Sequence, residues 1–472
     1  MATLIVQQPL DNPGTFDKVL PVGQEIIYTV SNSSVVSSFT NVKFIAEVHI
    51  SNSTPPNPNT TNDLVGTFKT TPNNAGVGMF DFRPIIESFV NADNLAREGS
   101  AYKGTTNTLN SNVPVHLIDK YSGNINTMRW FNVKFMVEYI DNDPTSATYG
   151  DLITNSEVIA GMCIIFNGYL KYTDELLLSG VNFGYDLYSN FLLDGSTKKF
   201  LTNAPTTQYA NLEDYGTVGL LMPYTAVGIE IIYFDSAGNY LSQEQINFTA
   251  ANGGFLYPQA NIQASLLYFG LFPANLQGSS TMFQGYVSAG TIQGGHYNLA
   301  VLNDTGQVAS SIYTINLNCP TLKGYEPIRL TWLNQWGAWD YYTFNMKSTK
   351  TISTKGSTYQ QLEGTWNKSS YKIDSFKGGK KAFRVNATEN IKMNTDFVSE
   401  SESEWFEELI NSPEVYILEG FQDDTVNSAL NNYVIPVRLT TSSYTKKTVA
   451  NDKLMQYTFE VEKSKTLRTQ SV

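Results

Sequence analysis

Charged residues, histidine and cysteine are all scarce in this chain, and each shortage excludes a class of protein. Only 16% of the 472 residues are charged, while 41% are apolar, which is too many for a largely disordered chain. Two cysteines are too few for a disulfide framework or a four-cysteine zinc site. No apolar run comes near the roughly 18 residues that a membrane-spanning helix needs, so we expect no membrane partner.

A secretion signal is also missing from the sequence. Met1 to Gln8 contain a short apolar stretch, without the basic residues and the longer apolar segment of a signal peptide. We therefore expect a soluble protein that is made in the cytoplasm without export.

The sequence contains none of the common catalytic motifs. A phosphate-binding loop, a dinucleotide-binding fingerprint, a nucleophile elbow and a zinc-protease motif are all absent. His49, His116 and His296 are scattered along the chain, and Cys163 and Cys319 each lie beside a strand-like run, as buried thiols do.

One acidic pair, Glu407 and Glu408, could suggest a glycosidase, because sugar hydrolysis needs two carboxylates. Neighbouring residues on a helix point about 100° apart, so a solvated helix face is the better interpretation. We expect no enzyme activity, no catalytic residues, no cofactor and no bound metal.

The residues that are abundant favour turns and strands. The chain has 44 Asn and 28 Tyr, with many Thr and Ser, and long helix-forming windows do not occur. The composition predicts a mainly β fold of tandem antiparallel β-sandwich domains, Ig-like or jelly-roll-like, followed by a C-terminal α+β domain.

We predict three domains, at residues 1–172, 173–322 and 323–472, and the charge distribution supports the second boundary. Residues 1–323 hold 13 basic and 25 acidic side chains and carry the whole net charge of −12, whereas residues 324–472 hold 18 of each. The first domain should contain one helix at Pro84 to Val90 and a long, largely structureless loop from Asn91 to Asn126.

Two turn sequences predict hairpins in the middle domain, Asp235 to Asn239 and Asn303 to Gly306. In the last domain, Ser401 and Glu404 fit a capping box that would begin a helix at Glu402 to Ile410.

An aromatic cluster marks the start of the last domain. It consists of Trp332, Trp336, Trp339, Tyr341 and Tyr342. One interpretation is a stacking platform for a glycan, since flat rings bind sugars and bases. The other, which we favour, is a hairpin with its turn at Asn334 to Gly337 and its rings in the core.

A basic segment follows the cluster. Between Asn345 and Arg384 there are nine basic and two acidic residues, a net charge of 9 − 2 = +7. Because the rest of the chain is acidic, a nucleic acid duplex would be repelled, and we expect no sequence-specific nucleic acid binding. We predict instead an interface with an acidic protein surface, such as a second copy of the chain. The candidate interface residues are Lys347, Lys350, Lys355, Lys377, Lys380, Lys381 and Arg384.

Three segments stand out by their residues and spacing: Ile328-Arg-Leu-Thr-Trp332-Leu-Asn334-x-x-Gly337-x-x-Asp340-x-x-x-Phe344, Asn411-Ser-Pro413-Glu-Val-Tyr416 after the Trp405 helix, and Phe200-Leu-Thr-Asn203-x-Pro205-x-x-x-Tyr209 with Asp214-Tyr-Gly216. Together these segments resemble virion structural proteins of tailed phages that infect Bacteroidota-type bacteria. Gln8-Pro9 and Phe44 to His49 are weaker matches near the N-terminus.

This resemblance implies a structural subunit of the virion, in the tail, the baseplate or the neck, that assembles with copies of itself and with other virion proteins. The rival interpretation is a carbohydrate-binding adhesin or depolymerase that recognises a host-surface glycan. Neither the residues nor the resemblance assigns a catalytic residue.

Overall fold

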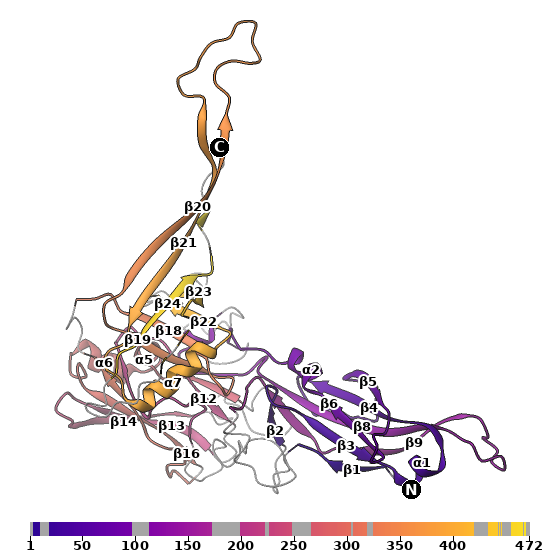
Figure 1. Ribbon diagram of the computed structural model, residues 1–472. Helices are drawn as coiled ribbons and strands as arrows, with labels where there is room; N and C mark the ends of the chain where they lie inside the picture. The colour runs from indigo at the N-terminus through magenta and orange to yellow at the C-terminus, as the bar shows by residue number, and fades with distance from the viewer. Residues whose placement is uncertain are drawn as a thin grey trace. The chain divides into compact units, whose positions relative to one another are not determined.

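A computed structural model of the chain describes residues 3–9, 18–96, 113–171, 199–221, 226–247, 266–303, 305–318, 324–419, 433–441, 443, 445, 455–465 and 467–468 (Figure 1). Strands hold 47% of the residues and helices 12%, so the predicted mainly β fold of antiparallel sheets is confirmed. Within these ranges, no helix combines the length and the apolar character that crossing a bilayer requires.

The chain forms two compact units. Unit 1 comprises Met1–Cys319, Leu333–Asp340 and Phe421–Asn431, and unit 2 comprises Pro320–Trp332, Tyr341–Gly420 and Asn432–Val472. The three-domain division, with its boundary at residue 172, stays a prediction.

The described part of unit 1 forms four sheets, with strand orders β1-β3-β6, β2-β10-β8-β4-β5 with β9 beside β8, β11-β17-β16-β13-β14, and β12-β15-β7. The strands are β1 (Leu4–Gln7), β2 (Lys18–Pro21), β3 (Ile27–Ser31), β4 (Thr40–Ser51), β5 (Leu64–Thr70), β6 (Val77–Asp81), β7 (Tyr121–Gly123), β8 (Met128–Ile140), β9 (Leu152–Ile159), β10 (Cys163–Phe166), β11 (Thr207–Ala210), β12 (Thr217–Leu221), β13 (Ala226–Phe234), β14 (Tyr240–Asn247), β15 (Leu266–Gly270), β16 (His296–Asn303) and β17 (Tyr313–Leu317). The helices are α1 (Ser33–Ser38), α2 (Arg83–Ile86), η1 (Glu87–Phe89), η2 (Val115–Leu117), α5 (Pro273–Ser279) and α6 (Thr281–Ser288).

Unit 2 is built on one sheet of eight strands in its described part, ordered β19-β18-β22-β23-β24-β21-β20 with β25 beside β21. Its elements are β18 (Ile328–Leu333), β19 (Trp339–Phe344), β20 (Thr349–Gln361), β21 (Gly379–Asn394), α7 (Glu400–Asn411), β22 (Val415–Leu418), β23 (Val434–Leu439), β24 (Thr458–Lys463) and β25 (Leu467–Arg468).

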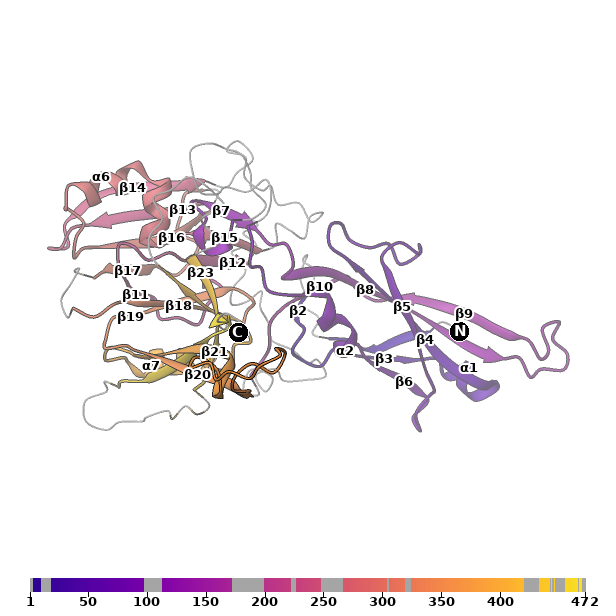
Figure 2. The same cartoon turned by 90° about the horizontal axis from the view of Figure 1, so that it is seen from above.

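The strands of the first two sheets of unit 1 lie close together in Figure 2. Their buried side chains form one core that is rich in aromatic rings. The Tyr28 ring of β3 lies 5.6 Å from the Phe135 ring of β8, and the Phe82 ring lies 6.0 Å from that of Phe131. Cys163 is buried in the same core, with its Sγ 3.7 Å from the Tyr28 hydroxyl, so one of the two expected buried thiols is confirmed. Cys319 lies outside the described residues.

Both predicted hairpin turns of the middle region are confirmed. Asp235 Oδ1 accepts from the backbone N–H groups of Ala237 and Asn239, and β13 pairs with β14. Asn303 Oδ1 accepts from the N–H groups of Thr305 and Gln307 in the same way. Asp and Asn favour such turns because their side chains bond to the backbone two residues further on.

Helix α6 covers one face of the five-stranded sheet. The Phe283 ring of α6 lies 5.7 Å from the Tyr233 ring of β13 and 5.9 Å from the Tyr297 ring of β16. The side chains of these three residues are completely buried, so this face forms the core of the region.

Helix α7 begins two residues earlier than the sequence predicts. Its N-cap is Ser399, whose side chain accepts from the Glu402 N–H while Glu402 bonds back to the Ser399 N–H. The sequence Ser-Glu-Ser-Glu offers two capping boxes two residues apart, and the earlier one extends the helix by half a turn. The predicted cap at Ser401 is therefore wrong, whereas the helix itself is confirmed.

Candidate assembly interface

The basic candidate residues lie on a long two-stranded hairpin of unit 2, the arm, which comprises β20, β21 and the tip loop Leu362–Gly378 between them. Thr349 pairs with Lys392 at its base and Gln361 with Gly379 at its outer end. Thr, Ser and Lys dominate these two strands and apolar residues do not alternate regularly, so no local sequence pattern marks them as strands.

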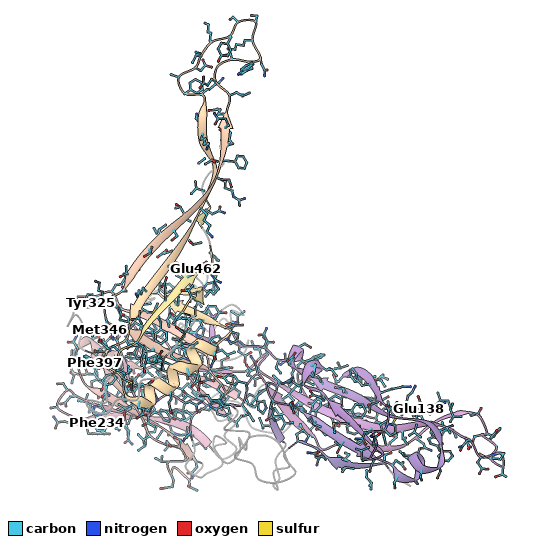
Figure 3. All side chains as sticks on the ribbon, in the orientation of Figure 1. Glu138, Phe234, Tyr325, Met346, Phe397 and Glu462 are labelled. Carbon is cyan, nitrogen blue, oxygen red and sulfur yellow. The ribbon has the colours of Figure 1, made fainter. Side chains whose placement is uncertain are left out.

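The outer part of the arm has no neighbouring strand among those described. β24 pairs with β21 only from Asn390 to Asn394, and β25 pairs with it only at Asn386 and Ala387. Figure 1 shows the arm extending past the other strands of its own sheet, and Met346 lies near its base in Figure 3.

The tip loop is held together by its own hydrogen bonds. Thr365 donates its N–H to the Lys372 carbonyl at 3.0 Å, and the Lys372 N–H donates back to the Thr365 hydroxyl at 3.0 Å. The Trp366 indole N–H and the Tyr371 hydroxyl both donate to the Glu363 carbonyl, at 2.7 and 3.3 Å. The loop therefore has a defined conformation before any partner binds.

The arm exposes large apolar side chains from its base to its tip. The exposed fractions lie between 53% and 74% for Ile352, Leu362, Trp366, Tyr371, Ile373, Phe376 and Phe383. Burying one such side chain contributes about 1.5 to 3 kcal/mol relative to full exposure. A single exposed Leu or Ile is ordinary on a protein surface, but seven on one hairpin indicate an interaction surface.

The predicted interface lysines differ in their local contacts. Lys350 Nζ lies 2.9 Å from Glu326 Oε1, and this hydrogen bond raises the pKa of Lys350. Lys377 forms an ion pair of 3.1 Å with Asp374, and Lys381 donates to the Phe376 carbonyl. Lys355 and Lys380 are exposed and have no ion pair within the described residues.

Arg384 is exposed on β21 opposite Ser357, and Lys347 is exposed just before β20. Lys377 and Lys381 thus help to hold the tip loop, whereas Lys355 and Lys380 are available to a partner.

The aromatic cluster lies in the interior rather than on a surface. Trp332, Trp336, Trp339 and Tyr341 are at most 3% exposed, and burial raises the pKa of Tyr342. Asn334 Oδ1 accepts from the N–H groups of Trp336 and Ala338 and so forms the expected turn. This arrangement fits the hairpin interpretation and leaves the rings of Trp332, Trp336, Trp339 and Tyr341 closed to a glycan.

Two of the segments that carry the phage resemblance pack against each other in unit 1. The Asn334 side chain donates to the Leu201 carbonyl at 3.0 Å, the Thr202 hydroxyl donates to Asp340 at 2.7 Å, and the Trp336 indole N–H donates to Asn203 at 3.1 Å. These residues therefore form a structural joint that is buried except at Asn203.

The predicted structureless loop from Asn91 to Asn126 is partly ordered. Its residues 97–112 lie outside the described residues, but Val115, Leu117 and Ile118 are completely buried and Tyr121–Gly123 forms β7. The expectation fails there because these apolar residues pack against distant segments, which a local pattern does not reveal.

Asp93, in the same loop, is also buried. Its Oδ1 accepts from the N–H groups of Ile125 and Asn126, and its Oδ2 accepts from the hydroxyls of Thr127 and Tyr268. Burial raises the pKa of the Asp93 carboxyl. The Trp339 indole N–H donates to the Asp93 backbone carbonyl at 2.8 Å, so Asp93 ties three distant segments together.

The residues considered for chemistry do not converge. In the described ranges, no three His, Cys, Asp or Glu side chains are placed to hold a metal ion. Glu408 is only 1% exposed, so the solvated helix face predicted for it is wrong; it lies three residues from the buried Trp405 and shares its side of α7.

Comparisons with known proteins assign no family. No family model and no curated protein matches the chain. Among solved structures, native alpha-2-macroglobulin of E. coli aligns with 83% of this chain at 8% identity and a TM-score of 0.18, and this chain covers 22% of that one. The C-terminal domain of the Streptococcus pyogenes antigen I/II-family protein AspA aligns with 67% of this chain, and with 98% of its own length, at 8% identity and a TM-score of 0.11.

Proposed function

We propose that this protein is a non-enzymatic structural subunit of a tailed-phage particle, in the tail, baseplate or neck, and that it assembles with other subunits through its arm. The observation that carries the proposal is the exposure of seven large apolar side chains on a hairpin, residues 349–394, that has nine basic and three acidic residues, a net charge of 9 − 3 = +6. Exposed apolar side chains do not stabilise a monomer, whereas their burial against a neighbouring subunit stabilises the assembly.

The phage assignment rests on the sequence resemblance described above, and the joint between residues 201–203 and 334–340 supports it indirectly. Residues that hold a fold together are expected to recur among proteins that share that fold. A glycan-binding adhesin is less well supported, because the aromatic cluster that would stack on sugars is buried.

Two measurements test the proposal. Mass spectrometry of purified phage particles should detect this chain in stoichiometric amount, and its absence from intact particles would contradict the virion assignment. Sedimentation velocity of the purified chain over a range of concentrations should show self-association, which a strictly monomeric protein would not. Binding to a glycan array, without incorporation into particles, would favour the adhesin.

A further inference from the structure

The outer face of the five-stranded sheet in unit 1 carries a row of side chains that crosses all five strands. The register aligns Tyr209 of β11, Asn316 of β17, His296 of β16, Phe234 of β13 and Tyr240 of β14. Adjacent strands lie about 4.8 Å apart, so the row spans about 19 Å.

This row is open to solvent at both ends. Tyr209 and Tyr240 are 61% and 57% exposed, and between them the His296 and Phe234 rings stack at 4.6 Å. The opposite face of the same sheet is closed by α6. Phe234 is labelled in Figure 3 at the end of β13.

The charge of this region is the opposite of the charge of the arm. Residues 200–322 contain no Lys or Arg, but they include six carboxylates. Glu230 stands on the outer face, because it pairs with Ala300 four residues along β16 from His296, and the Glu213 side chain is exposed after β11. Without residues 345–384, whose net charge is +7, the rest of the chain has a net charge of −12 − 7 = −19.

We infer that the arm of one copy docks across this outer face of a second copy. The inference rests on the proposed function and names the surface that the arm contacts. Exposed tyrosine rings fit the apolar and cationic side chains of the arm. Lys355, Lys368 and Lys380 are exposed, with no ion pair among the residues that the structure describes, and would meet the carboxylates. A contact between two different surfaces is heterologous, so it builds a ring where the rotation closes and a filament where it does not.

A lipid surface fits the arm less well. Five of the seven exposed apolar side chains lie in the tip loop, as in a loop that inserts into a bilayer, but Ile352 and Phe383 extend the apolar surface along the strands, which a bilayer would not reach. Contact along the whole length of the arm favours a protein partner.

Charge reversal in two separate variants tests the inference. One carries Lys355→Glu, Lys368→Glu and Lys380→Glu, and the other carries Glu213→Lys and Glu230→Lys. Each alone should associate at least tenfold more weakly than wild type in sedimentation velocity, and an equimolar mixture should recover association, because the reversed arm then meets a reversed sheet. The control Lys43→Glu, Lys120→Glu, Lys199→Glu makes the same change in net charge at exposed sites outside the arm and should associate normally.

A photo-crosslinker at Phe376, in a mixture of ¹⁴N- and ¹⁵N-labelled protein, locates the contact directly. Mixed-isotope crosslinks to residues 207–247 or 296–316 are expected. Crosslinks to another part of the second copy, or to lipid vesicles in preference to protein, would overturn the inference while leaving an arm-mediated assembly in place. Normal association of both reversal variants would overturn it as well, and a chain that stays monomeric would overturn the proposed function with it.

Discussion

The rings of Trp366 and Tyr371 pack edge to face at the tip of the arm, with 5.7 Å between their centroids, and both donate to the carbonyl of Glu363. Despite this contact, Trp366 remains 67% exposed and Tyr371 remains 54% exposed. Local packing therefore orders these rings without covering them, which is the state expected of a preformed binding surface.

Removing exposed rings from the tip should weaken assembly without unfolding unit 2. Trp366→Ala combined with Phe376→Ala should change the free energy of unfolding by less than about 1 kcal/mol, since exposed side chains contribute little. Association measured by sedimentation should fall at least tenfold. The matched control is Tyr325→Ala with Phe397→Ala, two residues of unit 2 outside the arm that are 48% and 58% exposed. Equal loss of association in both variants would argue against a specific role of the tip.

The conformation of the tip loop should affect association independently of which side chains the loop exposes. Gly364 has φ +69°, and a Cβ there would lie 2.4 Å from the Lys372 carbonyl oxygen and 2.7 Å from the Tyr371 ring. Gly379 has a similar φ of +73° but nothing within 4 Å of a Cβ. Gly364→Ala should therefore reduce association more than Gly379→Ala, because both variants carry the backbone strain and only one carries the clash. Equal association of the two would show that the loop conformation is irrelevant.

Salt should weaken the assembly. Raising NaCl from about 50 mM to about 500 mM shortens the screening length several-fold and reduces attraction between a positive arm and a negative surface. The apparent dissociation constant, measured by sedimentation equilibrium, should rise steadily across this range. Association that strengthens with salt would indicate a purely apolar contact.

Asp93 should make the stability of unit 1 depend on pH. Because burial raises the folded-state pKa of this carboxyl, its contribution is fully present below the ordinary pKa of an aspartate and is lost as pH rises through the folded-state value. Asp93→Asn mimics the protonated form, since the Thr127 and Tyr268 hydroxyls can reverse and accept from the amide. This variant should show a flatter dependence of the unfolding free energy on pH between about pH 4 and pH 8.

Asp93→Ala gives the matching comparison. It removes the acceptor of two N–H groups and leaves the two hydroxyls their longer bonds to the Asn91 and Gly337 carbonyls, so it should cost about 3 kcal/mol. Chemical denaturation at several pH values measures both effects, and equal stabilities of the Asn and Ala variants would show that these hydrogen bonds do not hold the segments together.

The sequence predicted those features that depend on local residues. The turns at Asp235 and Asn303 follow from side chains that bond to the nearby backbone, and the α7 helix follows from its cap and its apolar face. The start of that helix was misplaced because two capping boxes overlap, and sequence alone does not choose between them.

The sequence did not predict the strands of the arm or the contacts of Asp93. β20 has no buried face, so the alternation that marks a strand is missing, and its existence depends on hydrogen bonds to β21. Asp93 meets Tyr268 across 175 positions of the chain, and no spacing in a single sequence reveals such a contact. The sequence identifies the candidate lysines by their charge. Only the structure shows that the apolar side chains beside them are exposed and therefore available to a partner.

The most direct test of the account removes the outer arm. Replacing Ser357–Arg384 by Asn-Gly joins Gly356 to Val385, which face each other across the hairpin, and keeps the contacts of β21 with β24 and β25. Sedimentation velocity over a range of concentrations should then show a monomer that unfolds at the same denaturant concentration as wild type. If this shortened chain still assembles as the wild type does, the arm is not the interface and the account is wrong.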